Sequence, residues 1–194
     1  VIDAVYNAAV NYDRGQNLKE ANRTREFLVE AFGKSGATDN PLVIDTMYGI
    51  AQSYERIVNF KKAAIYFEKF AKRYPKDRRS KDAIFNAGVY RSTLGDYRAA
   101  EGMRRQFLSL YPGDDSAAEV MFSMCETMEK QADEVGQANA RAAAGLWKKT
   151  FACFDDWAST PTYSRSDFDR LCVSEYRRSE IMRKHLNNAR GASE

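Results

Sequence analysis

Apolar residues recur along this chain at the spacing of amphipathic α-helices. In TMYGIAQSYERI at 46–57 and in FKKAAIYFEKFAKRY at 60–74, apolar side chains return every three or four residues. No stretch shows the sustained apolar and polar alternation of a half-exposed strand. The pattern therefore predicts an all-α chain. The expected helices span roughly 2–14, 17–34, 41–57, 60–74, 79–94, 97–110, 116–134, 138–158 and 165–188.

Two of the expected helix pairs end in the same way. YFEKFAKRYPKD covers 66–77 and MRRQFLSLYPGD covers 103–114, and each carries Phe, then Tyr-Pro, then Asp, 37 residues apart. At the same offset other aromatic and small residues align, namely Tyr48 with Phe85, Ala51 with Gly88, and Ala63 with Ala100. Internal similarity at such a period is typical of helical repeat proteins.

The small residues at matched positions have a packing explanation. The break at 58–59 is so short that the second helix must return antiparallel to the first. A bulky side chain does not fit where two such helices cross closely, so we expect Ala51 to face Ala63 and Gly88 to face Ala100. The proline of each Tyr-Pro pair ends the second helix because it lacks an N–H donor.

This order of a small residue, an aromatic, Ala, an aromatic and a closing Pro resembles the tetratricopeptide repeat (TPR) family. One copy matches it with Ala51, Tyr54, Ala63, Phe67 and Pro75. The next copy keeps the small residues and the proline with Gly88, Ala100 and Pro112, but has Arg91 and Arg104 at the aromatic positions. A first copy shows Ala9, Tyr12 and Ala21, with Gly33 in place of the proline, and a fourth copy starts at 116 with Cys125 in the small position.

The resemblance implies an all-α, right-handed α-solenoid of antiparallel helix pairs with about four repeats. We expect repeats in 1–136, at about 2–34, 41–75 and 79–112, with a fourth from 116. A divergent last repeat and a C-terminal capping helix are expected in 137–194, because the end of a solenoid otherwise exposes an apolar face. Its apolar residues include Trp147, Phe151 and Phe154 and, on or near one side of the last helix, Phe168, Leu171, Cys172 and Met182. A docking surface for a following domain or a partner is the open alternative.

In the TPR family the first helices of successive repeats line a concave groove, so the resemblance also implies a candidate partner site. Each copy offers one acid and one aromatic ring, one turn apart on the same helix face. The candidate groove residues are Asp3, Tyr6, Asp45, Tyr48, Gln52, Asp82, Phe85, Glu119 and Phe122. They imply a protein or peptide partner with basic and apolar residues. Acids in first turns also stabilise helix N-termini, and rings also pack between repeats, so a structural role stays open.

A cluster of cations occupies KFAKRYPKDRRSK at 69–81. Its members are Lys69, Lys72, Arg73, Lys76, Arg78, Arg79 and Lys81. Cations near a helix C-terminus are favoured by the helix dipole, which makes a solvated rim the simplest interpretation. The functional alternative is binding of nucleic acid or another anionic surface.

The remaining composition points away from catalysis. The formal net charge of +3 neither requires nor excludes an anionic partner. The single His185 and the three widely spaced cysteines form no metal-ligand motif, and no phosphate-binding loop or nucleophilic triad is recognisable. We therefore expect no enzymatic activity, no cofactor, no metal and no small-molecule substrate. No apolar run approaches the length of about 18 residues that a transmembrane helix needs.

Three functions stay open. The leading hypothesis is a non-catalytic scaffold that binds a partner protein or peptide through the concave groove. The alternatives are a structural packing module of a larger bacterial envelope or motility assembly, and nucleic-acid or anionic-surface binding through 69–81.

The compartment is not determined by the sequence. The long period and the F-x-x-x-Y-P-x-D endings resemble a bacterial envelope branch that includes the outer-membrane-barrel assembly lipoprotein and the Tol-Pal coordinator, which favours the periplasm. Cysteines without a recognisable partner suit a reducing cytoplasm, and their odd number argues against a disulfide scaffold, although one pair can still form. We expect the native start, with any address signal, to precede Val1.

Overall fold

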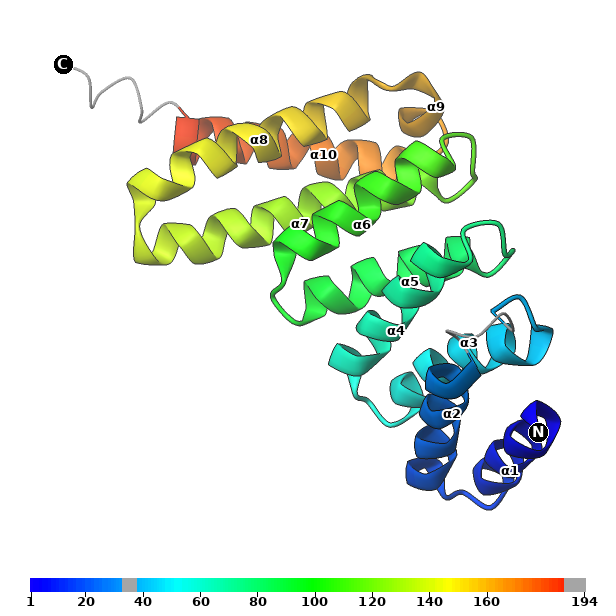
Figure 1. Cartoon of the computed structure of the whole chain (residues 1–194). Coiled ribbons are helices and arrows are strands. Elements are labelled where there is room, and N and C mark those ends of the chain that lie inside the picture. The colour runs from blue at the N-terminus through cyan, green and yellow to red at the C-terminus, as the bar shows by residue number, and fades with distance from the viewer. Residues whose placement is uncertain (33–37, 187–194) are drawn as a thin grey trace. The chain divides into compact units, whose positions relative to one another are not determined.

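The computed structural model of the chain describes residues 1–32 and 38–186, and the regular structure in these ranges is helical (Figure 1). The helices are α1 (Ile2–Arg14), α2 (Leu18–Phe32), α3 (Pro41–Arg56), α4 (Phe60–Arg73), α5 (Ser80–Thr93), α6 (Tyr97–Leu110), α7 (Ala117–Ala138), α8 (Ala140–Ser159), α9 (Pro161–Ser164), α10 (Phe168–Ile181) and the π-helical turn η1 (Met182–Leu186). The expected all-α class is confirmed. Gly33 and the expected helix ends at 34 and 188 lie outside the described residues.

The chain divides into two compact units, Val1–Leu94 (unit 1) and Gly95–Glu194 (unit 2). Unit 1 contains α1 to α5, and each of its helices packs against the next one along the chain. Unit 2 contains α6 to η1, with α7 between α6 and α8. In the described ranges no helix is both long and apolar enough to cross a bilayer.

The repeated Tyr-Pro-x-Asp endings build the same turn twice. In the first copy, Asp77 N donates to the Tyr74 carbonyl at 2.9 Å, and the Asp77 carboxylate accepts from Arg79 N at 2.9 Å. In the second copy, Asp114 N donates to the preceding tyrosine carbonyl at 3.1 Å, and its carboxylate accepts from Ser116 N at 3.0 Å. The aspartate therefore closes the turn on both sides, which explains why an aspartate recurs two residues after the Tyr-Pro pair in both copies.

The core of unit 1 contains the small residues that the repeat pattern singled out. Ala51 on α3 and Ala63 on α4 are both fully buried, as a close crossing of these two helices requires. Phe67 fills the space beside them and is also fully buried. Gly88 and Ala100 are buried as well, but they belong to different units, so their pairing stays a prediction.

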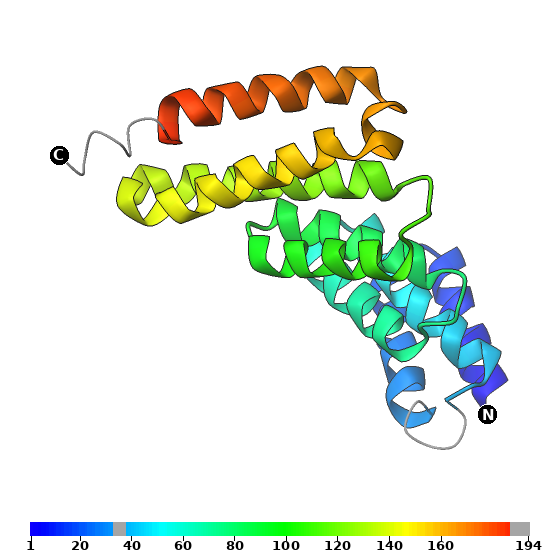
Figure 2. The same cartoon turned by 90° about the horizontal axis from the view of Figure 1, so that it is seen from above.

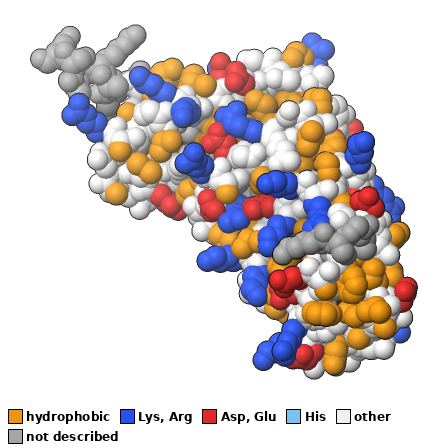
Figure 3. Space-filling model, in the orientation of Figure 1, with side chains coloured by type: hydrophobic (Ala, Val, Ile, Leu, Met, Phe, Trp, Pro, Cys, Tyr) orange, Lys and Arg blue, Asp and Glu red, His pale blue; other side chains and the backbone are white. Residues whose placement is uncertain are grey.

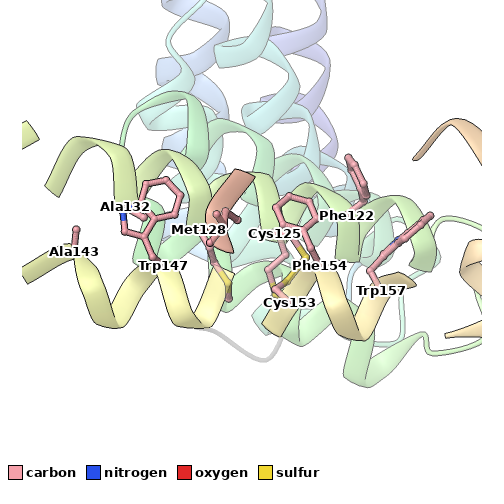
Figure 4. Packing of buried hydrophobic residues seen from close by; sticks show 11 residues of the cluster. Phe122, Cys125, Met128, Ala132, Ala143, Trp147, Cys153, Phe154 and Trp157 are labelled. Carbon is pink, nitrogen blue, oxygen red and sulfur yellow. A yellow bond between two sulfur atoms is a disulfide. The ribbon is translucent and has the colours of Figure 1, made fainter. Parts of the chain in front are cut away.

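The core of unit 2 lies between α7 and α8 (Figure 4). Trp147, Phe154 and Trp157 of α8 are nearly or completely buried, so the apolar residues of the tail form this core. They pack with α7, which continues to Ala138 and so passes through the expected repeat boundary at 136. Phe151 is only partly buried and lies at the edge of the same cluster.

Two of the three cysteines are joined. Cys125 on α7 and Cys153 on α8 form a disulfide with a Cα–Cα distance of 5.4 Å, inside the unit 2 core (Figure 4). The sequence left one such pair open, and the structure has it, with Cys172 as the free cysteine. The sequence could not show this pair because the two residues are 28 positions apart on different helices.

The last helix, α10, packs along α8 (Figure 2). The side of α10 that faces the core carries Ser174, which is fully buried, and Ile181, which is 2% exposed. Phe168 is 72% exposed and Cys172 is also exposed, so the expected apolar side of this helix is wrong for these two residues. The small Ser174 lets α10 approach closely, and that contact directs Phe168 and Cys172 outward.

Candidate functional site

A groove of about 400 Å³ lies on unit 1 and is lined mainly by α1 and α3 (the α1–α3 groove). Four of the predicted groove residues line it together, namely Tyr6, Asp45, Tyr48 and Gln52. The other lining residues are Ala9, Val10, Arg25, Thr46, Gly49, Arg78 and Arg79. These four residues line the same groove although Tyr6 and Gln52 are 46 positions apart in the sequence.

Helical spacing explains why these side chains share the groove. On α3, Asp45, Tyr48 and Gln52 follow each other at intervals of three and four residues, which places them on one face. Asn40 begins this helix by accepting a hydrogen bond from Leu42 N at 2.9 Å, which holds the start of the helix one turn before Asp45. Tyr6 occupies the matched position on α1.

Tyr48 is both a groove residue and a support of the core. Its ring contacts Phe67 and Phe70 edge-on, with centroid distances of 5.6 and 5.0 Å. On its other side the guanidinium carbon of Arg79 lies 5.2 Å from the ring centroid. Burial, and then the negative charge of Asp82, raise the pKa of the Tyr48 hydroxyl. Tyr48 is therefore neutral at physiological pH, and its hydroxyl stays available as a hydrogen-bond donor.

Arg79 neutralises much of the acidic character that the sequence suggested for this groove. One guanidinium nitrogen lies 2.8 Å from the Asp45 carboxylate, and another lies 2.8 Å from Asp77. The hydrogen bonds that Arg79 donates to Asp77, with a further one to Asp45, raise the pKa of Arg79, so the cation is permanent. The Asp45 carboxylate is consequently engaged inside the protein before any partner arrives.

Arg25 enters the groove from α2, which the sequence did not indicate. It forms an ion pair with Asp13, whose other carboxylate oxygen accepts from Arg56 Nη1 at 2.9 Å. Burial opposes ionisation of Asp13, but the hydrogen bonds from the two arginines lower its pKa. This network ties α1, α2 and α3 together and holds the walls of the groove. Its members are 12 and 43 residues apart, which no local sequence pattern reveals.

The other predicted groove residues lie elsewhere. Asp3 and Asp82 are exposed and do not line the groove, and Phe85 is half-buried on α5. In unit 2, Glu119 is exposed. Phe122 is 6% exposed and was wrongly expected on a binding surface.

Phe122 is buried because the tail of the chain covers it. Its ring contacts Phe154 and Trp157 edge-on, with centroid distances of 5.6 and 5.3 Å. The guanidinium carbon of Arg170, from α10, lies 5.7 Å from the same ring. Phe122 is therefore a core residue of unit 2.

The basic cluster at 69–81 is divided between two grooves and the exposed turn. Lys69, Lys72 and Arg73 line a groove of about 700 Å³ next to α2, together with Glu26 and Glu30. Arg78 and Arg79 line the α1–α3 groove instead, while Lys76 is exposed and Lys81 is partly exposed. On the face drawn in Figure 3, cationic and acidic side chains are interspersed. This distribution does not favour the continuous basic surface on which nucleic-acid binding depends.

His185 has a structural position in unit 2. Its ring stacks on Trp147 with a centroid distance of 3.8 Å, and burial lowers its pKa. Among residues 1–32 and 38–186, no group of three or more His, Cys, Asp or Glu side chains is placed to hold a metal ion.

Comparison with known proteins identifies the repeat. A family model for the tetratricopeptide repeat matches residues 45–77, which cover α3, α4 and the turn that follows. Residues 45–77 are therefore a tetratricopeptide repeat. No curated protein sequence matches it significantly.

Solved structures of TPR proteins are similar in fold to this chain. One contains nearly identical TPR-like repeats of a Podosopora anserina protein assigned as a kinesin light chain. The two chains are 12% identical, the alignment covers 98% of this chain and 89% of that chain, and the TM-score is 0.55. Another is the MamA protein, with 12% identity, coverage of 97% and 94%, and a TM-score of 0.50. The fold class is therefore an all-α, TPR-like solenoid of antiparallel helix pairs. At this identity the likeness concerns the fold alone.

Proposed function

We propose that this chain is a scaffold that binds a segment of a partner protein in the α1–α3 groove. The TPR fold indicates a protein–protein interaction scaffold. One observation carries the finer proposal: Tyr6, Tyr48 and Gln52, taken from the first helices of two successive copies, line a single groove. Aromatic rings offer a large contact area at a low entropy cost, and they often supply the strongest anchors of interfaces.

The lining suggests what the partner segment presents. Apolar side chains would pack on Tyr6 and Tyr48, and the exposed amide of Gln52 would hydrogen bond to the backbone of the partner. A basic side chain of the partner is expected at Asp82, which is exposed and close enough to raise the pKa of Tyr48. Asp45 is the weaker candidate for that contact because a basic residue would have to displace Arg79 from it.

Site-specific cross-linking in the source organism tests this proposal. A photo-reactive amino acid replaces Gln52 in the groove, and in a control chain it replaces Lys61, which is exposed on α4 and lines no groove described above. We expect position 52, but not position 61, to capture one protein reproducibly. Mapping the cross-linked peptide then identifies the segment for direct binding measurements.

The binding measurements use substitutions that spare the core. Tyr6→Ala and Gln52→Glu change the groove lining, whereas Tyr48→Ala would also remove two edge contacts to buried rings. If each anchor contributes about 2 kcal/mol, Tyr6→Ala weakens binding about 30-fold. Tyr12→Ala, on the same helix outside the groove, should change it less than twofold. Equal binding by Tyr6→Ala, Gln52→Glu and the unmodified chain would show that the partner uses another surface.

A further inference from the structure

Unit 2 carries a second groove, which runs between α6 and α8 over a floor made by α7. Its main part has a volume of about 500 Å³, and a neighbouring part of about 250 Å³ shares Glu101, Met128 and Lys149 with it. The remaining lining residues are Arg98, Arg105, Leu108, Met121, Met124, Gln131, Leu146, Ala152, Cys153 and Asp156. We call the two parts together the Met-lined groove.

The floor of this groove is apolar and adaptable. Met121 is half-buried, while Met124 and Met128 are 5% and 6% exposed, so their thioether groups form the bottom of the groove. Methionine side chains have three rotatable bonds and a polarisable sulfur, and they fit apolar partners of varied shape. The disulfide from Cys153 to Cys125 ties the α8 wall to the α7 floor, which keeps the groove formed without a ligand.

The dimensions of the groove fit a short helix. On α8 the lining runs from Leu146 to Asp156, a rise of about 15 Å at 1.5 Å per residue. That length equals about three turns of an α-helix. An extended segment would bring unpaired backbone groups against a methionine floor that offers them no strong hydrogen-bond partner, whereas a helix satisfies its own backbone.

The rim charges distinguish the two ends. In the middle, Arg105 Nε lies 2.7 Å from the Glu101 carboxylate, so these charges offset each other. Arg98 and Lys149 are exposed together at one end, and within residues 1–32 and 38–186 neither forms an ion pair. Asp156 is exposed at the other end. The groove is therefore positive at one end and negative at the other.

We propose that the Met-lined groove docks an amphipathic helix of about three turns from a partner protein. The helix carries apolar residues at i, i+4 and i+7, carboxylates at the end that meets Arg98 and Lys149, and a Lys or Arg at the end that meets Asp156. Apolar burial on the methionines provides the affinity, and the rim charges select the partner and its direction. This surface is separate from the α1–α3 groove, so the proposal does not depend on peptide binding there.

A designed peptide and methionine NMR test the docking site. The probe is a capped helical peptide of about four turns with Leu on one face, two Glu at one end and two Lys at the other, and its order-reversed version is tested in parallel. The full chain is labelled with ¹³C at its methionine methyl groups. We expect saturable shifts of Met121, Met124 and Met128 with one of the two peptides, while Met47 in unit 1 and Met182 stay unchanged.

Charge reversal separates this proposal from general stickiness. Arg98→Glu with Lys149→Glu should weaken binding of the probe about tenfold and strengthen binding of a peptide with Lys at both ends. Lys130→Glu with Arg165→Glu changes the net charge equally at exposed positions outside the groove and should alter binding less than twofold. Met121→Glu, at a half-buried position, should abolish binding while the chain still folds.

Three results would overturn the proposal. The first is the absence of shifts at Met121, Met124 and Met128 up to about 1 mM of either peptide. A dissociation constant above this concentration is too weak for specific protein recognition. The second is equal binding by the groove and control charge reversals. The third is a shift of the same methyl groups with chain concentration alone, which would make a second copy of the chain the occupant.

Discussion

Removing the disulfide between Cys125 and Cys153 should destabilise unit 2 by about 3.6 kcal/mol. The bond joins residues that are 28 positions apart, and a cross-link that closes a loop of this size lowers the entropy of the unfolded chain by about 12 cal/mol/K. At 25 °C this corresponds to about 3.6 kcal/mol. Cys125 is fully buried and Cys153 is 6% exposed, so the reduced thiols would remain packed as small apolar groups and the folded state would change little.

The tryptophans make this loss measurable. Trp147 and Trp157 are the only two tryptophans of the chain, and both are buried in unit 2, so their fluorescence follows the unfolding of that unit. Urea titrations of the oxidised chain and of Cys125→Ala with Cys153→Ala should differ in midpoint by roughly 1–4 M, for slopes of about 1–3 kcal/mol/M. Cys172→Ala, at the exposed free cysteine, is the matched control and should shift the free energy of unfolding by less than about 0.5 kcal/mol.

The expected loss of stability would be refuted if the urea unfolding curves of the oxidised chain and of the Cys125→Ala, Cys153→Ala variant coincided. Thiol counting in denaturant without reductant provides the independent check. One reactive thiol per chain agrees with the disulfide, whereas three would show that the bond does not form.

Three further predictions concern the repeat packing, the interhelical turn and the tail. Ala63→Leu should overpack the α3–α4 crossing and cost about 1–3 kcal/mol in urea unfolding, and unchanged stability would contradict the close crossing. Asp77→Asn should cost about 1–2 kcal/mol at neutral pH, because Asp77 accepts three hydrogen bonds from Arg79. These bonds lower the pKa of Asp77, so its contribution is complete above about pH 4 and disappears as the pH falls through the folded-state pKa; a difference between the two chains that persists at pH 2 would contradict this. Deleting 137–194 should expose the α7 face of the unit 2 core and give oligomers in light scattering, whereas a monomer with an unchanged melting temperature would show that the tail is an independent module.

Much of the secondary structure could be predicted because its causes are local. Asn40 before a proline predicts the start of α3, and the structure has that cap. The repeated Tyr-Pro-x-Asp endings predict helix ends, and Asp77 closes the turn through backbone groups within three residues. The pairing of small residues predicts a close crossing, and Ala51 and Ala63 are fully buried. In each case the sequence neighbours that determine the geometry are within one or two turns, or recur at the repeat period.

The candidate site was predictable only in part. The resemblance to the TPR family selected first-helix positions, and Tyr6, Asp45, Tyr48 and Gln52 do line one groove. It could not select Arg25, since that residue lies on a second helix and is held by an ion-pair network across three helices.

The sequence by itself therefore determined the helices, their turns and the repeat family. The tertiary structure alone decided which side chains are free to meet a partner. Phe122 and Tyr48 are aromatic residues at the same position of two repeat copies, yet Phe122 is covered by α8 and α10. Phe168, in contrast, is exposed because α10 packs through the side that carries Ser174. The physical reason is that exposure, ion pairing and disulfide formation depend on residues that are distant in the chain. A local pattern determines the face of a helix on which a side chain lies, but only the packed neighbours determine whether that face meets solvent.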